Sequence, residues 1–184
     1  MTFIYTGKGD DGYSGLLGEG RVPKYHPRLE ALGALDEANA ALGMARAFCN
    51  IPRTCTFIIS VQRDLYYLMA EVAATPENAS KFRSIQSQNI EILEQEINHI
   101  HASINIPSEF ILPGESISGS MFAMARTIIR RAERHIAGLL HSGEIENAQI
   151  LRYLNRLSSL CFLLEILEYQ TNGNSKVTLA KDII

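Results

Sequence analysis

The sequence has few cysteines, and none of them form a motif typical of a metal or disulfide-rich protein. Its 184 residues include only Cys49, Cys55 and Cys161, an odd number without a CxxC pair. Small secreted domains that depend on disulfides carry more cysteines, usually in even numbers. We therefore expect no zinc or iron–sulfur centre, no metal bound by the protein alone, and a reducing, cytoplasmic location. Cys161 lies in an apolar stretch and is expected to be buried.

Long apolar runs and a large excess of one charge are also absent. The densest apolar stretch, residues 160–167, is interrupted by Glu165 and is too short to cross a membrane. The first residues, MTFIYTGKGD, lack the apolar stretch of a signal peptide. The formal net charge is −3, which does not favour a basic surface for nucleic acid. We expect a protein that binds neither membranes nor nucleic acids.

Strand-like alternation is missing as well, and no repeat or low-complexity tract is present. Apolar residues recur instead at spacings of three and four, which indicates helices with one buried face. The predicted helices span about residues 27–49, 54–73, 90–100, 116–141 and 144–169. A loop is expected at 74–84, and a short extended segment at 110–112. Long helices with short connections favour an all-α, five-helix antiparallel bundle.

We expect one domain over residues 1–184, consistent with a chain of this length. It would consist of an irregular, glycine-rich N-terminal arm at 1–26, the bundle at about 27–170 and a tail at 171–184. The composition of the tail does not predict its structure.

The arm contains six of the 13 glycines within the first 20 residues, a density that excludes a helix. Gly7, Gly9 and Gly12 match G-x-G-x-x-G, but no βαβ unit surrounds them and no P-loop is present. Glycines let backbone N–H groups approach an anion. The side chains that could then hold a polyphosphate are those of Thr6, Lys8, Ser14 and Lys24. Asp10 and Asp11 could instead position a hydrated Mg²⁺, and a flexible arm without a ligand is the other interpretation.

The fourth predicted helix carries unusual charge, reading RTIIRRAER from 126 to 134. Arg126, Arg130 and Glu133 fall on one helical face. Small or apolar residues are expected to share that face: Gly119, Phe122, Ala123 and Ala137. The residues expected to turn away from it into the core are Met124, Ile128, Ala132, Ile136 and Leu139. Either the charged face is solvated and held by i,i+4 pairs, or it binds an anion or a partner's carboxylate.

Taken together, six motifs resemble those of the PduO-type ATP:cob(I)alamin adenosyltransferases, in the same order. They read YTGKGDDG at 5–12, GRVPK at 20–24, GALDE at 33–37, FILPG at 110–114, ARTIIRRAER at 125–134 and YLNRLS at 153–158. The resemblance covers roughly residues 3–168. Glu19, Glu115 and Ser159 depart from the usual pattern of the family.

The resemblance implies a homotrimer with active sites between adjacent subunits. It implies transfer of the 5′-deoxyadenosyl group of ATP to the cobalt of cob(I)alamin, with Mg²⁺, giving adenosylcobalamin and triphosphate. A reductase that supplies Co(I) and an enzyme that uses adenosylcobalamin would then be transient partners. The alternative is a non-catalytic carrier or sensor of corrinoid or nucleotide with the same bundle. A purely structural bundle would leave the glycine-rich arm unexplained.

The resemblance also implies roles for individual residues. Those expected at ATP are Thr6, Gly7, Lys8, Gly9, Ser14, Gly15, Lys24, Arg130, Arg131, Glu133, Arg134 and Asn155. Asp36 and Arg126 are expected to form a salt bridge across the subunit boundary, and Phe110 is expected at the lower face of the corrinoid. Arg130, Lys8 and Phe110 are the residues expected to act in catalysis.

The implied chemistry needs no serine, cysteine or general base from the protein, because cob(I)alamin is itself a strong nucleophile. Lys8, Lys24, Arg130 and Mg²⁺ would offset the charge that develops on the departing triphosphate. An aromatic ring at Phe110 would keep water and the nucleotide base away from the cobalt.

Overall fold

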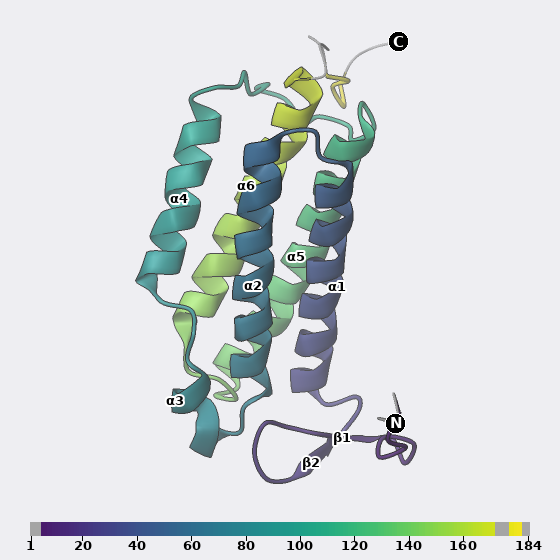
Figure 1. Cartoon of the computed structure of the whole chain (residues 1–184), viewed down its shortest axis with the longest axis vertical. Helices are drawn as coiled ribbons and strands as arrows, with labels where there is room; N and C mark the ends of the chain where they lie inside the picture. Colours follow the sequence, from purple (N-terminus) through teal and green to yellow (C-terminus); the bar gives the residue numbers. More distant parts are fainter. Residues whose placement is uncertain (1–4, 172–176, 182–184) are drawn as a thin grey trace.

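The structure, a computed structural model, describes residues 5–171 and 177–181 (Figure 1). Long helices run up and down beside one another along most of that length. They are α1 (Pro27–Phe48), α2 (Pro52–Ala73), α4 (Ser87–His101), α5 (Ile117–His141) and α6 (Ala148–Thr171). The expectation of a mostly helical bundle is confirmed.

The expected count of five helices is wrong for the described residues, which form six α-helices. The additional one is the four-residue α3 (Ala79–Phe82), preceded by the 3-10 helix η1 (Pro76–Asn78). Both lie in the segment that we expected to be a loop. Pro76 stands at the first turn of η1, where its fixed φ suits a helical start. A single turn is too short to give a hydrophobic period in the sequence.

The arm is not irregular throughout, because it contains a short antiparallel hairpin. Strands β1 (Tyr13–Gly15) and β2 (Arg21–Pro23) pair with Tyr13 opposite Pro23. Gly18 and Gly20 between them have φ angles of 154° and 98°, which a glycine adopts without strain. Three-residue strands are too short to show alternation, so sequence patterns did not reveal them.

Local signals set the helix ends close to their expected positions. Pro27 opens α1, and the His26 ring accepts a hydrogen bond from the Arg28 N–H at 3.2 Å. The Ser116 hydroxyl caps α5 by accepting from the Gly119 N–H at 3.1 Å. Gly143, with φ 75°, follows the end of α5 and permits the left-handed turn expected there.

The core lies where α1 and α6 pack along the two sides of α5, with α2 outside α1 and α4 outside α6. Small residues let α1 approach its neighbours closely: Ala31, Ala34, Ala38 and Ala45, all buried. The C-terminal half of α6, from Leu160 to Tyr169, is buried on nearly all sides, as its apolar sequence predicts. Cys161 is fully buried within it, and burial raises the pKa of its thiol to about 12.

The expected orientation of α5 needs correction. Met124 was assigned to the core but is 58% exposed, whereas the small or apolar residues expected beside the charges, Gly119, Phe122 and Ala123, are buried. Because α5 packs against both α1 and α6, its buried arc is wider than one stripe and includes Phe122. Arg126 is consequently half-buried beside these apolar residues.

Candidate functional site

The tip of the arm is held by one arginine. Arg21 donates to both carboxylate oxygens of Asp11 at 2.7 Å, to the Tyr13 carbonyl at 3.0 Å and to the Lys8 carbonyl. The Arg21 guanidinium, together with the Tyr13 N–H, lowers the pKa of Asp11 to about 2. The loop from Lys8 to Tyr13 is therefore tied to β2, a role for Arg21 that the motif search did not assign.

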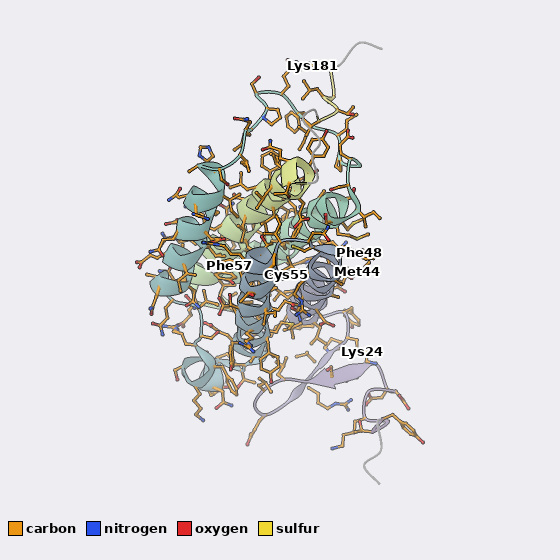
Figure 2. All side chains as sticks on the ribbon, turned by 45° about the horizontal axis from the view of Figure 1, so that its top comes forward. Lys24, Met44, Phe48, Cys55, Phe57 and Lys181 are labelled. Carbon is orange, nitrogen blue, oxygen red and sulfur yellow. The ribbon has the colours of Figure 1, made fainter. Side chains whose placement is uncertain are left out.

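Glycines make room within this loop. Gly7 and Gly12 have φ angles of 68° and 81°, and a methyl group on Gly9 would lie 3.2 Å from Lys24 Nζ. The Lys24 N–H donates to the Gly12 carbonyl at 2.8 Å. Lys24 thus reaches over the glycine loop, and Figure 2 shows it at the end of the bundle that carries the arm. The structure therefore brings together Gly9 and Lys24, two of the residues predicted at ATP.

A second set of contacts fastens the arm to the end of α2. The Leu17 N–H donates to the Ala73 carbonyl at 2.8 Å, and the Thr75 N–H donates back to the Leu17 carbonyl at 3.2 Å. A side chain on Gly18 would collide with Thr75, because its Cβ would lie 2.3 Å from the Thr75 hydroxyl oxygen. From Thr6 to Lys24 the arm makes no hydrogen bond or ion pair with α5 within the described part of the chain.

The helical half of the predicted site is a row of polar side chains across α5 and α6. Arg130 Nη1 lies 4.0 Å from a carboxylate oxygen of Glu133. The Asn155 amide donates to the other oxygen of Glu133 at 2.9 Å. Arg134 folds back and donates to the Arg130 carbonyl at 3.1 Å. Four of the residues predicted at ATP therefore lie together on two adjacent helices.

Arg131 has a different partner, since it forms an ion pair with Glu37 on α1. It follows Arg130 directly in the chain, but a helix turns consecutive side chains about 100° apart. Arg131 therefore holds α5 to α1, while Arg130 faces the Glu133 side. Its predicted contact with ATP stays a prediction.

Two neighbouring hollows lie beside this polar row and share Arg126 and Phe162. The first, of about 230 Å³, is lined mainly by Phe110, Ile111, Pro113 and Glu165 besides the shared pair. The second, of about 450 Å³, includes Ile106, Arg130, Ser158 and Ser159. Phe110, Arg126 and Arg130 are thus brought to one surface. The motif search missed Phe162 and Ile106, which belong to no charged or glycine-rich pattern.

The electrostatics of the first hollow are unusual for an apolar surface. The Glu165 side chain is buried there, and this burial raises the pKa of its carboxyl group, while the charge of Arg126 acts in the opposite direction. Arg126 Nε is buried and has no hydrogen-bond partner among the described residues. No ion pair joins Asp36 to Arg126 in the described part of one chain, and Asp36 is exposed.

The segment with Phe110 is extended, as expected, and its partner is the tail. The Leu112 N–H donates to the Thr178 carbonyl, and the Ala180 N–H donates to the Phe110 carbonyl, both at 2.8 Å. The Thr178 N–H also donates to the Glu115 carboxylate at 3.0 Å. The main chain of Phe110 is therefore fixed while its side chain is 87% exposed at the hollow. Of the tail, only residues 177–181 are described beyond Thr171.

No group of three or more histidine, cysteine or acidic side chains in residues 5–171 and 177–181 is arranged to hold a metal ion. Over the same residues, no helix is both long and apolar enough to span a membrane.

Comparisons with known proteins agree with the helical fold. The family model described as cobalamin adenosyltransferase matches residues 4–168. The corrinoid adenosyltransferase PduO of Salmonella typhimurium is 40% identical over 163 residues, which cover 88% of this chain and 48% of that protein. The chain spans about half the length of this relative and of its counterpart in Citrobacter freundii.

Other similar proteins match over most of their length. The corrinoid adenosyltransferase of Bacillus subtilis is 36% identical over 163 residues, covering 86% of this chain and 82% of that protein. A variant PduO-type ATP:corrinoid adenosyltransferase from Lactobacillus reuteri, solved with cobalamin and ATP, superimposes with a TM-score of 0.90. Its sequence identity is 28%, and the match covers 98% of this chain and all of that one.

Proposed function

This chain belongs to the cobalamin adenosyltransferase family, and from that membership we propose that it transfers the 5′-deoxyadenosyl group of ATP to the cobalt of cob(I)alamin. The products would be adenosylcobalamin and triphosphate. One observation of this chain carries the proposal: an apolar hollow bearing an exposed aromatic ring, Phe110, adjoins a hollow lined by Arg130. A corrin ring binds to an apolar surface such as the hollow at Phe110, and a polyphosphate binds to a cationic one such as the hollow at Arg130.

In the proposed step, the electron pair of Co(I) attacks the 5′ carbon of ATP. A cobalt–carbon bond forms, the bond from that carbon to the 5′ oxygen breaks, and the triphosphate leaves with the bonding electrons. The protein contributes by holding the cobalt and the ribose carbon in line. Phe110 and Phe162 would cover the lower face of the corrinoid, opposite the reacting face, and keep water away from the cobalt there.

We propose that the arm and the polar row of α5 and α6 hold ATP together. The proposed contacts are Thr6, Gly7, Lys8, Gly9, Ser14, Gly15, Lys24, Arg130, Arg131, Glu133, Arg134 and Asn155. Lys8, Lys24 and Arg130 would stabilise the charge on the leaving triphosphate. The acceptor Glu133 and the amide of Asn155 suit the neutral, hydroxyl-bearing part of a nucleotide better than its phosphates.

Magnesium fits this site as a companion of the phosphates. Asp11 is engaged by Arg21, whereas Asp10 is exposed and forms no ion pair among the described residues. One carboxylate together with phosphate oxygens is a usual way of binding Mg²⁺. Asp10 would therefore hold the ion, which would supply charge neutralisation along the triphosphate.

We further propose a homotrimer in which the arm of one subunit and the polar row of the next form each site. Among the described residues of one chain, the arm from Thr6 to Lys24 forms no hydrogen bond or ion pair with α5, and this supports the arrangement. So do exposed apolar side chains on the neighbouring helices α1 and α5, namely Met44, Phe48, Ile117 and Met124. Figure 2 shows the first two on α1. An Asp36–Arg126 salt bridge across the boundary would give the buried Arg126 Nε an acceptor.

The chain over 1–184 would act as one domain in the cytoplasm, where its three free cysteines remain reduced. A reductase would supply Co(I), and an adenosylcobalamin-dependent enzyme would accept the product.

The test is a spectroscopic assay under anaerobic conditions. Protein is mixed with ATP, Mg²⁺ and chemically reduced cobalamin, and the absorbance of cob(I)alamin is followed. Its loss, with adenosylcobalamin and triphosphate formed in equal amounts, supports the proposal. A carrier or sensor would bind the ligands and leave the absorbance unchanged, and that result would reject the enzyme.

A further inference from the structure

We propose that Arg156 is a positioning residue for ATP: it fixes the orientation of the Asn155 amide and is itself held in place by Glu94 on α4. The inference rests on the proposed function, because it concerns the nucleotide site of that reaction. It assigns a role in that site to α4, a helix that packs against α6 and carries none of the residues predicted at ATP.

The contacts form a continuous chain across three helices. Glu94 Oε1 accepts from Arg156 Nε at 2.8 Å. Arg156 Nη1 donates to the Asn155 side-chain oxygen, also at 2.8 Å. Asn155 Nδ2 donates to Glu133 at 2.9 Å, and Glu133 lies 4.0 Å from Arg130. A charge on α4 is thereby linked to the arginine proposed at the phosphates.

The donors and acceptors in this series of contacts allow only one orientation of the Asn155 amide. A guanidinium can only donate hydrogen bonds, and an ionised carboxylate can only accept them. Between Arg156 and Glu133, the oxygen of Asn155 must therefore face the arginine and its nitrogen must face the glutamate. A flipped amide would place its NH₂ group against Arg156 and its oxygen against Glu133, so both contacts would be lost. Arg156 thus decides which group of Asn155 a bound nucleotide meets.

Helical geometry alone does not produce this contact. Adjacent residues on a helix point about 100° apart and do not normally touch through their side chains. Arg156 reaches Asn155 only by lying along the helix surface, and its bond to Glu94 holds it there. The Arg156 and Glu94 side chains are 38% and 41% exposed, so a simple ion pair between them would contribute little to stability. We therefore expect the Arg156–Glu94 ion pair to affect ligand binding rather than folding stability.

The experiment measures the dissociation constant of Mg²⁺–ATP for the full chain by calorimetry, without corrinoid. Arg156→Met should raise it about fivefold, the effect of one lost hydrogen bond. Glu94→Ala should act in the same direction, and Arg156→Lys should restore part of the affinity. In an Asn155→Ala background, Arg156→Met should have no further effect, because the two residues act as one unit.

The matched control is Arg53→Met, which removes another interhelical ion pair. Arg53 Nη2 lies 2.6 Å from Glu96 on α4, and no described hydrogen bond or ion pair joins either residue to Glu94, Arg156, Asn155 or Glu133. Its replacement should leave the affinity for ATP unchanged. An equal loss in Arg53→Met and Arg156→Met would assign the effect to general loosening of α4 and overturn the inference.

The combined charge swap Glu94→Arg with Arg156→Glu gives the sharpest distinction. It retains an α4–α6 ion pair, so the thermal midpoint should stay close to that of the unaltered protein. It also places an acceptor beside Asn155, which favours the wrong amide orientation, so ATP affinity should stay low. Full recovery of the affinity for ATP would show that the ion pair only holds α4 against α6, and it would reject the inference.

The measurements distinguish failure of the proposed function from failure of the positioning role of Arg156. If the unaltered protein binds ATP but does not consume cob(I)alamin, the adenosyltransferase proposal fails and the positioning role is still decided by the binding constants. If the unaltered protein binds no ATP, both are rejected. An Arg156→Met constant within twofold of the original would overturn the positioning role alone.

Discussion

Asn155 on α6 donates to Glu133 on α5 at 2.9 Å, and this contact joins the two helices that carry the proposed nucleotide residues. Glu133 also lies 4.0 Å from Arg130, one turn earlier on α5. A carboxylate shared by an amide and a guanidinium restricts the positions of both. The polar row is therefore organised before any ligand binds, which lowers the entropy lost on binding.

Replacing Arg130 by alanine should lower the rate of adenosylcobalamin formation by about 100-fold, as for other charge-stabilising groups in active sites. Its side chain is half-exposed and its only described ion pair is the long one to Glu133, so the thermal midpoint should change little. The measurement is the anaerobic absorbance assay beside a melting curve. Arg152→Ala, which removes only a surface contact to Gln149, is the matched control. A variant of Arg130 with full activity would remove this residue from the mechanism.

Reversing the charge of Asp36 or Arg126 alone should weaken the proposed trimer and lower activity. A mixture of the two single variants, or a chain with both reversals, should recover part of each property, because the opposite charges would face each other again across the boundary. The assembly state is measured by light scattering after gel filtration. If the double variant shows the sum of two independent losses, the residues are not partners.

Phe110→Ala should lower the rate of adenosylation without weakening ATP binding. The ring is 87% exposed, so its loss costs little folding free energy. Removing its cover over the corrinoid should slow the reaction by about tenfold or more, equivalent to roughly 1.4 kcal/mol. Calorimetry with Mg²⁺–ATP and the absorbance assay separate the two effects. Equal losses in both would place Phe110 at the nucleotide and contradict its assigned role.

Gly18→Ala should release the arm from the end of α2. The added carbon would lie 2.3 Å from the Thr75 hydroxyl oxygen, at a φ of 154° that alanine rarely adopts. The N–H groups of Leu17 and Thr75, which bond across this junction, should exchange with solvent at least about tenfold faster. Glu19→Ala, at the exposed neighbouring position, is the control. Unchanged exchange in Gly18→Ala would show that the junction does not hold the arm.

The tip of the arm should lose stability in acid. The pKa of Asp11 is lowered from 3.8 to about 2, chiefly by Arg21, so its ionised form is favoured in the folded arm. The stabilisation is complete above about pH 4 and is lost as the pH falls through about 2. Nuclear magnetic resonance of the Arg21 side chain should report its release over that range. Asp11→Asn should show the released signal already at neutral pH.

Much of the bundle could be predicted because helix signals are local. Pro27, Ser116 and Gly143 act within one turn of their own positions, and apolar periodicity marks the buried stripe of each long helix. The orientation of α5 was misjudged for Met124, because a stripe pattern assumes one packing partner and α5 has two. The motif order identified Arg130, Glu133 and Asn155, and the structure places them together.

From the sequence alone one obtains the long helices, their ends and the residues that a shared motif order selects, because these depend on neighbours within a few positions or on direct comparison of letters. Only the tertiary structure decided that residues 177–181 pair with the Phe110 segment, that Arg131 pairs with Glu37, and that Glu94 holds Arg156 against Asn155. Except for the bond between the neighbours Arg156 and Asn155, each of these contacts joins residues that are far apart in the sequence. Their energies depend on distance and direction in space, which no local pattern of residues specifies.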